Sequence, residues 1–485
     1  MTTTTQQTGT HGSRFLSSDV VTSSIDSIVE ELRRRQSQIT EPRGPDSENR
    51  VLFDELSAMM TETRGRGLYY DFIASGIGNG ALVELLDGSV KWDMINGIGV
   101  HFFGHSEPEL VRTALEAATG DTVMQGHLQM NEDAIRYADT LVRYASRSSD
   151  LAHCFFSTSG AMANENALKI AYQKHQPAER VLAFSHCFMG RTTVMAQIGD
   201  SAAGRDGVPL NMHIDYMPFY GEALERLMRS GDHSAKTHAI DATVRQLEKF
   251  IARYPKQHTC FVFELVQGEG GFNTAPPEFH KALMEVCKAN DIAVWVDEIQ
   301  TFGRTESLFA FEAMGLGELV DICTVGKMTQ VCATLFSDRY NPKPGLLSGT
   351  FLGGSAPLRV GRRIVERLAE GDYYGPDGRI AQHHRAFAGQ VSAIKSRHPE
   401  WFPDVVGVSE TAGGYGGMLR FTPFGGDKDK MIKLSKTLFE DGVIAFYCGH
   451  NPFHIRMLPA LGVFKMEDWP RVFEIVERSM AKVAG

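Results

Sequence analysis

From about residue 150 onward, short apolar runs alternate with stretches of helical periodicity, and this alternation limits the possible fold more than any other feature. Strands that are buried on both faces of a parallel sheet appear in sequence as continuous apolar runs, and the helices between them form the crossovers. The segment from Pro276 to Asn290, between two of the runs, repeats apolar residues on one helical face. The pattern predicts an α/β domain with a mostly parallel sheet. The runs are LAHCFFS, RVLAFSH, TCFVFELV, IAVWVDEI and DICTVG.

The chain has 485 residues, which exceeds what a single hydrophobic core usually organises, so we expect more than one domain. Residues 1–75 are predicted to form an N-terminal extension with helices, and residues 76–350 the large α/β domain. Within the large domain, two apolar segments flank Asp87-Gly88, which predicts a hairpin. Beyond about Pro357 the pattern changes to long helical segments, so residues 351–485 are predicted to form a smaller α+β domain.

The charge pattern argues against several classes of partner. The formal net charge is -10, so the chain lacks the basic surface that binding to DNA, RNA or an anionic membrane requires. No apolar run approaches the roughly 20 residues of a membrane-spanning helix. The seven cysteines are scattered and odd in number, which is typical of reduced thiols in a cytoplasmic protein. We expect a cytoplasmic protein without nucleic-acid or membrane partners.

Polar residues at the ends of the apolar runs are the candidates for chemistry, because ligands of open α/β sheets bind beyond the carboxyl ends of the strands. Ser159, Gly160 and Ala161 follow the first run and open a helix, whose free backbone N–H groups could receive a phosphate. An N-cap that serves its own helix is the alternative. Asp297 ends another run, and a buried carboxylate needs a cation or several donors, for which a helix cap or salt bridge is the alternative.

The run DICTVG ends in Gly326 and is followed by Lys327, and a lysine at such a strand end can have its pKa lowered enough to act as a nucleophile. A phosphate-loop lysine is excluded, because Asp321 and Met328 occupy the positions where that motif requires glycine and a hydroxyl residue. A surface lysine is the remaining alternative. His383-His384 does not predict a metal site, because neighbouring helical positions do not converge on one ion.

Taken in this order, the segments resemble those of the class III aminotransferases, which are fold-type I enzymes dependent on pyridoxal phosphate. The resemblance runs from about Asp87 to about Leu461. Its segments are FFSTSGAMANENALKIA, FSHCFMGRT, FVFELVQGEGG, DEIQTFGRT, VGKMTQ, SGTFLGG and HIRMLPAL. The resemblance implies a large domain with a seven-stranded type of sheet, a smaller α+β domain and pyridoxal 5'-phosphate as cofactor.

The resemblance also implies roles for individual residues around this cofactor. Lys327 would carry it as a Schiff base and move the proton between substrate and cofactor carbons. Asp297 would pair with the protonated ring nitrogen, which keeps the cofactor an electron sink. The other implied contacts are Ser159, Gly160 and Ala161 with the phosphate, Phe188 and Ile299 with the two faces of the ring, and Gln300 near the ring hydroxyl. Thr350 would reach the phosphate of a neighbouring subunit, which implies a homodimer with shared active sites.

For the substrate, the resemblance implies that Arg456 binds a carboxylate and that Glu264 lies beside it, masking it when an ω-amine is the donor. A fork of five N–H donors makes arginine suited to a carboxylate. A permanent Glu264–Arg456 ion pair without a substrate role is an equal alternative.

The expected activity is transfer of an amino group from an ω- or α-amino acid to a 2-oxo acid such as 2-oxoglutarate. Donors of the 4-aminobutyrate, ornithine, acetylornithine or lysine type fit the resemblance. Aminomutase, racemase or decarboxylase activity on the same scaffold is one alternative, because fold and cofactor do not decide which bond breaks. A non-catalytic relative is the other.

Overall fold

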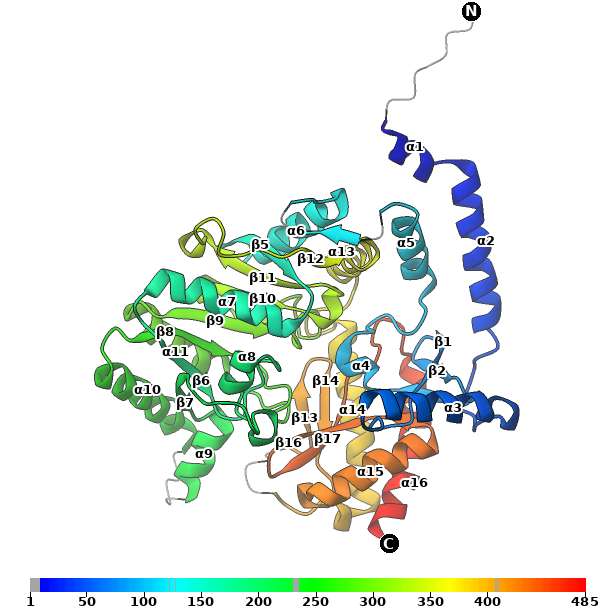
Figure 1. The fold of residues 1–485 in the computed structure, drawn as a ribbon. Coiled ribbons are helices and arrows are strands. Elements are labelled where there is room, and N and C mark those ends of the chain that lie inside the picture. The colour runs from blue at the N-terminus through cyan, green and yellow to red at the C-terminus, as the bar shows by residue number, and fades with distance from the viewer. Residues whose placement is uncertain (1–8, 122, 127, 230–234, 406–407, 409) are drawn as a thin grey trace, which may run out of the picture.

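The computed structural model describes residues 9–121, 123–126, 128–229, 235–405, 408 and 410–485. Its largest feature is a seven-stranded sheet in the order β5-β11-β10-β9-β8-β6-β7 (Figure 1). Strand β11 is antiparallel to both of its neighbours, and the other neighbouring strands are parallel. The α/β class and the mostly parallel sheet are confirmed. The strands are β5 (Leu151–Ser157), β6 (Arg180–Phe184), β7 (His213–Met217), β8 (His258–Phe263), β9 (Ala293–Glu298), β10 (Ile322–Val325) and β11 (Cys332–Ser337).

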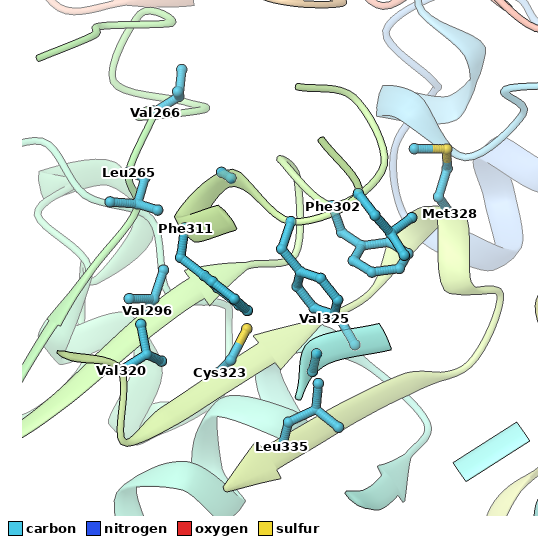
Figure 2. Close-up of a cluster of buried hydrophobic side chains, with 14 of the residues drawn as sticks. Leu265, Val266, Val296, Phe302, Phe311, Val320, Cys323, Val325, Met328 and Leu335 are labelled. Atoms are coloured by element: carbon cyan, nitrogen blue, oxygen red, sulfur yellow. The ribbon is translucent and has the colours of Figure 1, made fainter. Parts of the chain in front are cut away.

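The central strands alternate their side chains between two separate hydrophobic cores. In β8, Phe261 and Phe263 lie in one core, whereas Cys260 and Val262 lie in the other. Figure 2 shows part of the first core, where Val296 of β9 lies near Cys323 and Val325 of β10. Full burial of one apolar side chain such as valine or phenylalanine stabilises the folded state by about 1.5–3 kcal/mol. The strands of this sheet are therefore held firmly, and the residues at their ends keep fixed positions.

Two smaller sheets lie in the other half of the molecule. One is antiparallel, in the order β13 (Ala412–Tyr415), β14 (Met418–Phe421), β17 (Phe453–Met457) and β16 (Phe446–Gly449). The other contains β1 (Ala74–Asn79), β2 (Leu82–Leu85), β3 (Val90–Asp93) and β15 (Val443–Ile444), with β3 parallel to β15. These sheets share a core with α14 (Arg379–Arg397), α15 (Lys428–Asp441) and α16 (Trp469–Ala484).

The predicted hairpin forms, with Gly88 at φ 80° in its turn. Its strand β3 pairs with β15 from the C-terminal part of the chain, so residues 74–93 lie beside the C-terminal layer. The division at residues 75 and 350 stays a prediction.

The N-terminal helices form an arm that extends from the body (Figure 1). Strands β12 (Phe351–Gly354) and β4 (Val123–Gln125) form a separate antiparallel ribbon. No helix of the described ranges is long and apolar enough to cross a membrane. The remaining helices are α1 (His11–Leu16), α2 (Asp19–Gln36), α3 (Ser47–Arg64), α4 (Asn96–Gly99), α5 (Pro108–Ala118), α6 (Glu132–Ala145), α7 (Gly160–His175), α8 (Thr193–Ile198), α9 (Tyr220–Arg229), α10 (Ala235–Arg253), α11 (Pro277–Ala289), α12 (Ala310–Ala313) and α13 (Ser355–Glu370).

Candidate active site

A cavity lies at the carboxyl ends of the parallel strands, where α/β sheets bind ligands. Most of the site residues that were predicted from the sequence line this cavity. Asn164 and Glu269 also line it and were not predicted. Ser159, Thr350 and Arg456 are not among its lining residues. The lining residues are Gly160, Ala161, Asn164, Phe188, Met189, Gly190, Glu264, Glu269, Asp297, Ile299, Gln300 and Lys327.

Asp297 lies in β9 one residue before its end and is only 4% exposed. Its two carboxylate oxygens accept hydrogen bonds from the Ile299 amide at 2.9 Å and from Asn164 Nδ2 at 2.8 Å. Burial raises the pKa of Asp297 to about 6, against the lowering effect of these bonds and of Lys327. A cation placed in the cavity would stabilise the ionised form.

Asn164 is a site residue that the sequence analysis missed. It lies on α7, and its Nδ2 also donates to the Met189 carbonyl at 2.8 Å. At 1% exposure it is buried among apolar helix positions such as Ala163 and Ala167. A polar residue on the buried face of a helix needs a partner, and that was the available signal.

Lys327 is the second residue after β10, and its backbone has φ 54°, in the left-handed region. Burial lowers the pKa of its amine, and the charge of Arg456 acts in the same direction. Opposing effects come from Glu269, Asp297 and Cys332. A lowered pKa increases the fraction of neutral amine, which is the nucleophilic form.

Gly326 leaves room for two side chains beside the strand end. A Cβ on Gly326 would lie 2.9 Å from Cys332 Sγ and 3.0 Å from Ile299 Cδ1. A larger residue would force these side chains to shift, so glycine before the lysine allows them to pack closely against the strand end.

Ser159 is the N-cap of α7, and its side chain accepts the Met162 amide at 3.2 Å. The Ser159 side chain therefore caps its own helix, which was the alternative to phosphate binding. The first turn of this 16-residue helix begins at Gly160, beside the cavity, and its N-terminal end carries partial positive charge. Phosphate binding there stays a prediction.

Phe188 and Ile299 both line the cavity, as expected for residues that pack on a ring. Gln300 is 8% exposed, and its buried Oε1 has no hydrogen-bond partner among the described residues. The same holds for the buried Oδ1 of Asn164. Two vacant acceptors and the Asp297 carboxylate suit a ligand that offers a ring hydroxyl and a protonated ring nitrogen, and pyridoxal phosphate offers both.

The ion-pair partner of Arg456 is Glu269 rather than Glu264, although Glu264 lies close enough for its charge to raise the pKa of Arg456. Glu264 instead accepts the amides of Gly268 at 2.8 Å and Phe188 at 3.1 Å, and Arg456 Nη2 binds Glu269 Oε1 at 2.8 Å. The physical reason is a turn. The chain turns at Gly268, whose amide bonds to the Glu264 carboxyl, and the next residue, Glu269, then lies within bonding distance of Arg456. The glycine-rich sequence GEGG was the available signal for that turn.

Arg456 lies in β17 of the antiparallel sheet and is fully buried. Its guanidinium lies 5.4 Å from the centre of the Phe446 ring and 5.8 Å from that of Phe272. Burial lowers the pKa of Arg456, but Glu269 outweighs this effect and the pKa lies above its ordinary value. Its Nε and Nη1 are buried and have no hydrogen-bond partner in the part of the chain that the structure describes. The guanidinium therefore has donors to spare for a second acceptor.

Thr350 lies outside this cavity, as expected for a residue that serves another subunit. It is exposed and precedes β12, and its carbonyl accepts the Gly126 amide at 2.8 Å. Its role stays a prediction.

Comparison with known proteins agrees with this geometry. The profile of the family described as aminotransferase class-III matches residues 72–480. The chain is 25% identical over 408 residues to the mitochondrial acetylornithine aminotransferase of Eremothecium gossypii, covering 81% of this chain and 87% of that protein. It is 27% identical over 446 residues to the L-lysine-epsilon aminotransferase of Mycobacterium tuberculosis, covering 86% and 90%.

Among solved structures, the fold is similar to that of lysine aminotransferase from M. tuberculosis in the internal aldimine form. The TM-score is 0.75 at 23% identity, with 88% of this chain and 99% of that chain covered. The family match spans far more than half of the sequence and includes every residue of the cavity. The chain belongs to the class III aminotransferases and is a transaminase that depends on pyridoxal phosphate and moves an amino group between an amino acid and a 2-oxo acid.

Proposed function

We propose that this enzyme takes the terminal amino group of an ω-amino acid of the lysine or ornithine type and transfers it to 2-oxoglutarate or a similar 2-oxo acid. The observation that carries the proposal is the Arg456–Glu269 ion pair beside the cavity of Lys327. The extended match to L-lysine-epsilon aminotransferase supports the same class of donor.

Pyridoxal phosphate supplies an electron sink for the bond-breaking step when it is bound. We assign Lys327 to its covalent attachment, Asp297 to the proton on its ring nitrogen, and Gln300 to its ring hydroxyl. Phe188 and Ile299 pack against the ring. The amides of Gly160 and Ala161, with the capping residue Ser159, hold the phosphate at the positive end of α7. The neutral Lys327 Nζ then accepts and returns the substrate proton.

Arg456 is assigned to the substrate carboxylate. A 2-oxo acid brings a carboxylate close to the reacting carbon, whereas an ω-amine donor has only CH₂ groups there. Glu269 can serve both cases, because it lies on a turn and its side chain is 36% exposed, whereas Arg456 is fixed and buried. Glu269 neutralises Arg456 when the ω-amine is bound and leaves it to the carboxylate of the 2-oxo acid. We prefer this exchange to a permanent ion pair.

A homodimer belongs to the same proposal. The region around Thr350 exposes large apolar side chains that a monomer would normally bury. They are Leu128 at 93%, Met130 at 57%, Ile135 at 60% and Phe351 at 62% exposure. A second copy of the chain would cover them and bring Thr350 to the partner's phosphate site.

The first test is the visible absorption spectrum of the purified protein with pyridoxal phosphate, beside a Lys327→Ala variant. We expect a yellow lysine-bound form in the wild type, its absence in the variant, and bleaching by L-lysine or L-ornithine. Release of more than one equivalent of oxidised donor per active site only when a 2-oxo acid is supplied separates transamination from mutase, racemase and decarboxylase activity. A wild type that stays colourless would support a non-catalytic relative.

A further inference from the structure

Glu264 has no assigned role once Arg456 is seen to pair with Glu269. It directly follows β8, is 7% exposed, and lines the cavity with Asp297 and Lys327. Among the described residues, Glu264 forms no ion pair with a lysine, arginine or histidine. A buried carboxyl group in a ligand cavity without a cation partner requires a physical account.

Each carboxyl oxygen of Glu264 holds a different irregular segment. Oε2 accepts the amide of Phe188, which lies in the stretch after β6 that has no regular secondary structure. Oε1 accepts the amide of Gly268, where the turn that carries Glu269 begins. Backbone N–H groups outside helices and sheets depend on such side-chain acceptors. One side chain therefore bonds to two segments, and each of these segments supplies a residue that lines the cavity, Phe188 or Glu269.

The surroundings of Glu264 are closely packed. Burial raises its pKa to about 8 and the negative charge of Asp297 adds to the effect, whereas the bonds from the Gly268 and Phe188 amides oppose it. Gly268 leaves no spare room at this point, because a Cβ there would lie 2.1 Å from Gln300 Oε1 and 3.2 Å from Glu264 Oε1. The turn, Gln300 and Glu264 are therefore closely packed, and a shift of one of them displaces the others.

We propose that Glu264 is a positioning residue that joins the Phe188 wall of the cavity to the turn that carries Glu269, and so couples binding of the cofactor ring to recognition of the substrate carboxylate by Arg456. The inference rests on the proposed function, because it concerns the cofactor and the carboxylate assigned above. Glu264 acts through Phe188 and Glu269 and makes no contact of its own with the substrate.

The test measures two properties that lie on different sides of Glu264. The first is the affinity of the cofactor-free protein for 4′-deoxypyridoxine 5′-phosphate, which has the ring and the phosphate but cannot bond covalently to Lys327. The second is the KM for 2-oxoglutarate. Glu264→Gln can accept only one of the two amides, so we expect both the dissociation constant and the KM to rise about tenfold.

Glu298→Gln is the matched control. Glu298 is also buried and also accepts two backbone amides, those of Ala310 and Phe311, but it does not line the cavity. We expect this variant to lower the melting temperature and to leave both measured properties unchanged. If the two glutamine variants behave alike, Glu264 contributes only to stability and the proposal is overturned.

A double-mutant cycle tests whether Glu264 acts through Phe188. We expect the Phe188→Leu variant and the double variant with Glu264→Gln to bind the analogue equally weakly. Additive losses would overturn the proposal. If Glu264→Gln does not fold, Glu264→Asp replaces it, since a shorter carboxyl cannot reach both amides, and wild-type values in that variant would also overturn the proposal. A wild-type protein that binds neither the analogue nor pyridoxal phosphate would refute the proposed function instead.

Discussion

The two walls of the cavity are built in different ways. On one wall, Asp297 and Lys327 lie at or directly beyond the ends of neighbouring parallel strands, and Asn164 reaches Asp297 from a helix that packs on the same sheet. The other wall contains Glu269, which lies on the turn after β8, and its partner Arg456 lies behind it in a separate antiparallel sheet. The first wall depends on one rigid sheet, whereas the second depends on how two parts of the molecule meet. Substitutions on the two walls should therefore impair different properties.

The largest effect is expected on the sheet wall, from Asp297→Asn. The amide cannot carry the negative charge that stabilises a protonated ring nitrogen, so we expect kcat/KM to fall on the order of 10²–10³-fold for every donor and acceptor. Steady-state kinetics with several substrate pairs would measure this. A loss that is confined to carboxylate-bearing acceptors would show that the two walls are not distinct.

A smaller and more selective effect is expected behind the opposite wall, from Arg456→Met. Loss of a buried charged partner typically costs 2–5 kcal/mol, so we expect kcat/KM for 2-oxoglutarate to fall by about 100-fold. The half-reaction with a donor amine that lacks a carboxylate is the control and should retain its rate. Equal losses for both substrates would assign Arg456 to the structure of the site and not to recognition.

Asn164→Leu should have a smaller effect again, on the sheet wall. It keeps the branching of the side chain but removes the bond to Asp297 Oδ2, so the carboxylate loses one of its two donors. We expect about tenfold weaker binding of pyridoxal phosphate, measured by absorbance titration, with an unchanged KM ratio between acceptors. A changed acceptor preference would contradict the separation of the walls.

The smallest effect is expected beneath the sheet wall, at His280 of α11. Its ring stacks on Phe263 at 5.7 Å, and burial lowers its pKa to about 3 from the ordinary 6.5. Because the folded state holds this histidine neutral, its contribution to stability is present above pH 6.5 and is lost as the pH falls toward 3. His280→Phe removes that loss. The free energy of unfolding of the variant relative to wild type should therefore rise by about 1 kcal/mol between pH 7 and pH 5.5.

Denaturant titrations of the cofactor-free protein at the two pH values would measure this difference. If the difference in free energy of unfolding between variant and wild type does not change with pH, a group other than His280 takes up the proton. The KM values of the variant should match those of wild type, because His280 does not line the cavity.

What could be predicted from the sequence follows the same division between the walls. Asp297 and Lys327 end apolar runs, and parallel strands align their carboxyl ends at one edge of a sheet, so local pattern was enough to bring them together. Strands β7 and β11 were not predicted. β7, with the sequence HIDYM, mixes polar and apolar residues, and β11 runs antiparallel, which the pattern of crossovers does not indicate.

The contacts of the other wall could not be derived locally. Glu264 and Glu269 are five residues apart, and either could face an arginine nearly 200 positions later. The fold back at Gly268 decides between them, and that turn is stabilised by the buried Glu264 carboxyl itself. Asn164 was overlooked because its neighbours form a plausible apolar face, and its partner Asp297 is distant in sequence.

The helix α7 has a consequence for which molecules the enzyme can accept in place of its cofactor. Gly160, at the proposed phosphate end, and Asn164, which fixes Asp297, are four residues apart on one straight element, so about 6 Å of helix rise separates them. A helix packed along a sheet does not stretch. A homologue of pyridoxal phosphate with one extra methylene between ring and phosphate could therefore contact either Asp297 or the proposed phosphate end of α7, but not both. We expect the enzyme to select its cofactor by length as well as by chemistry.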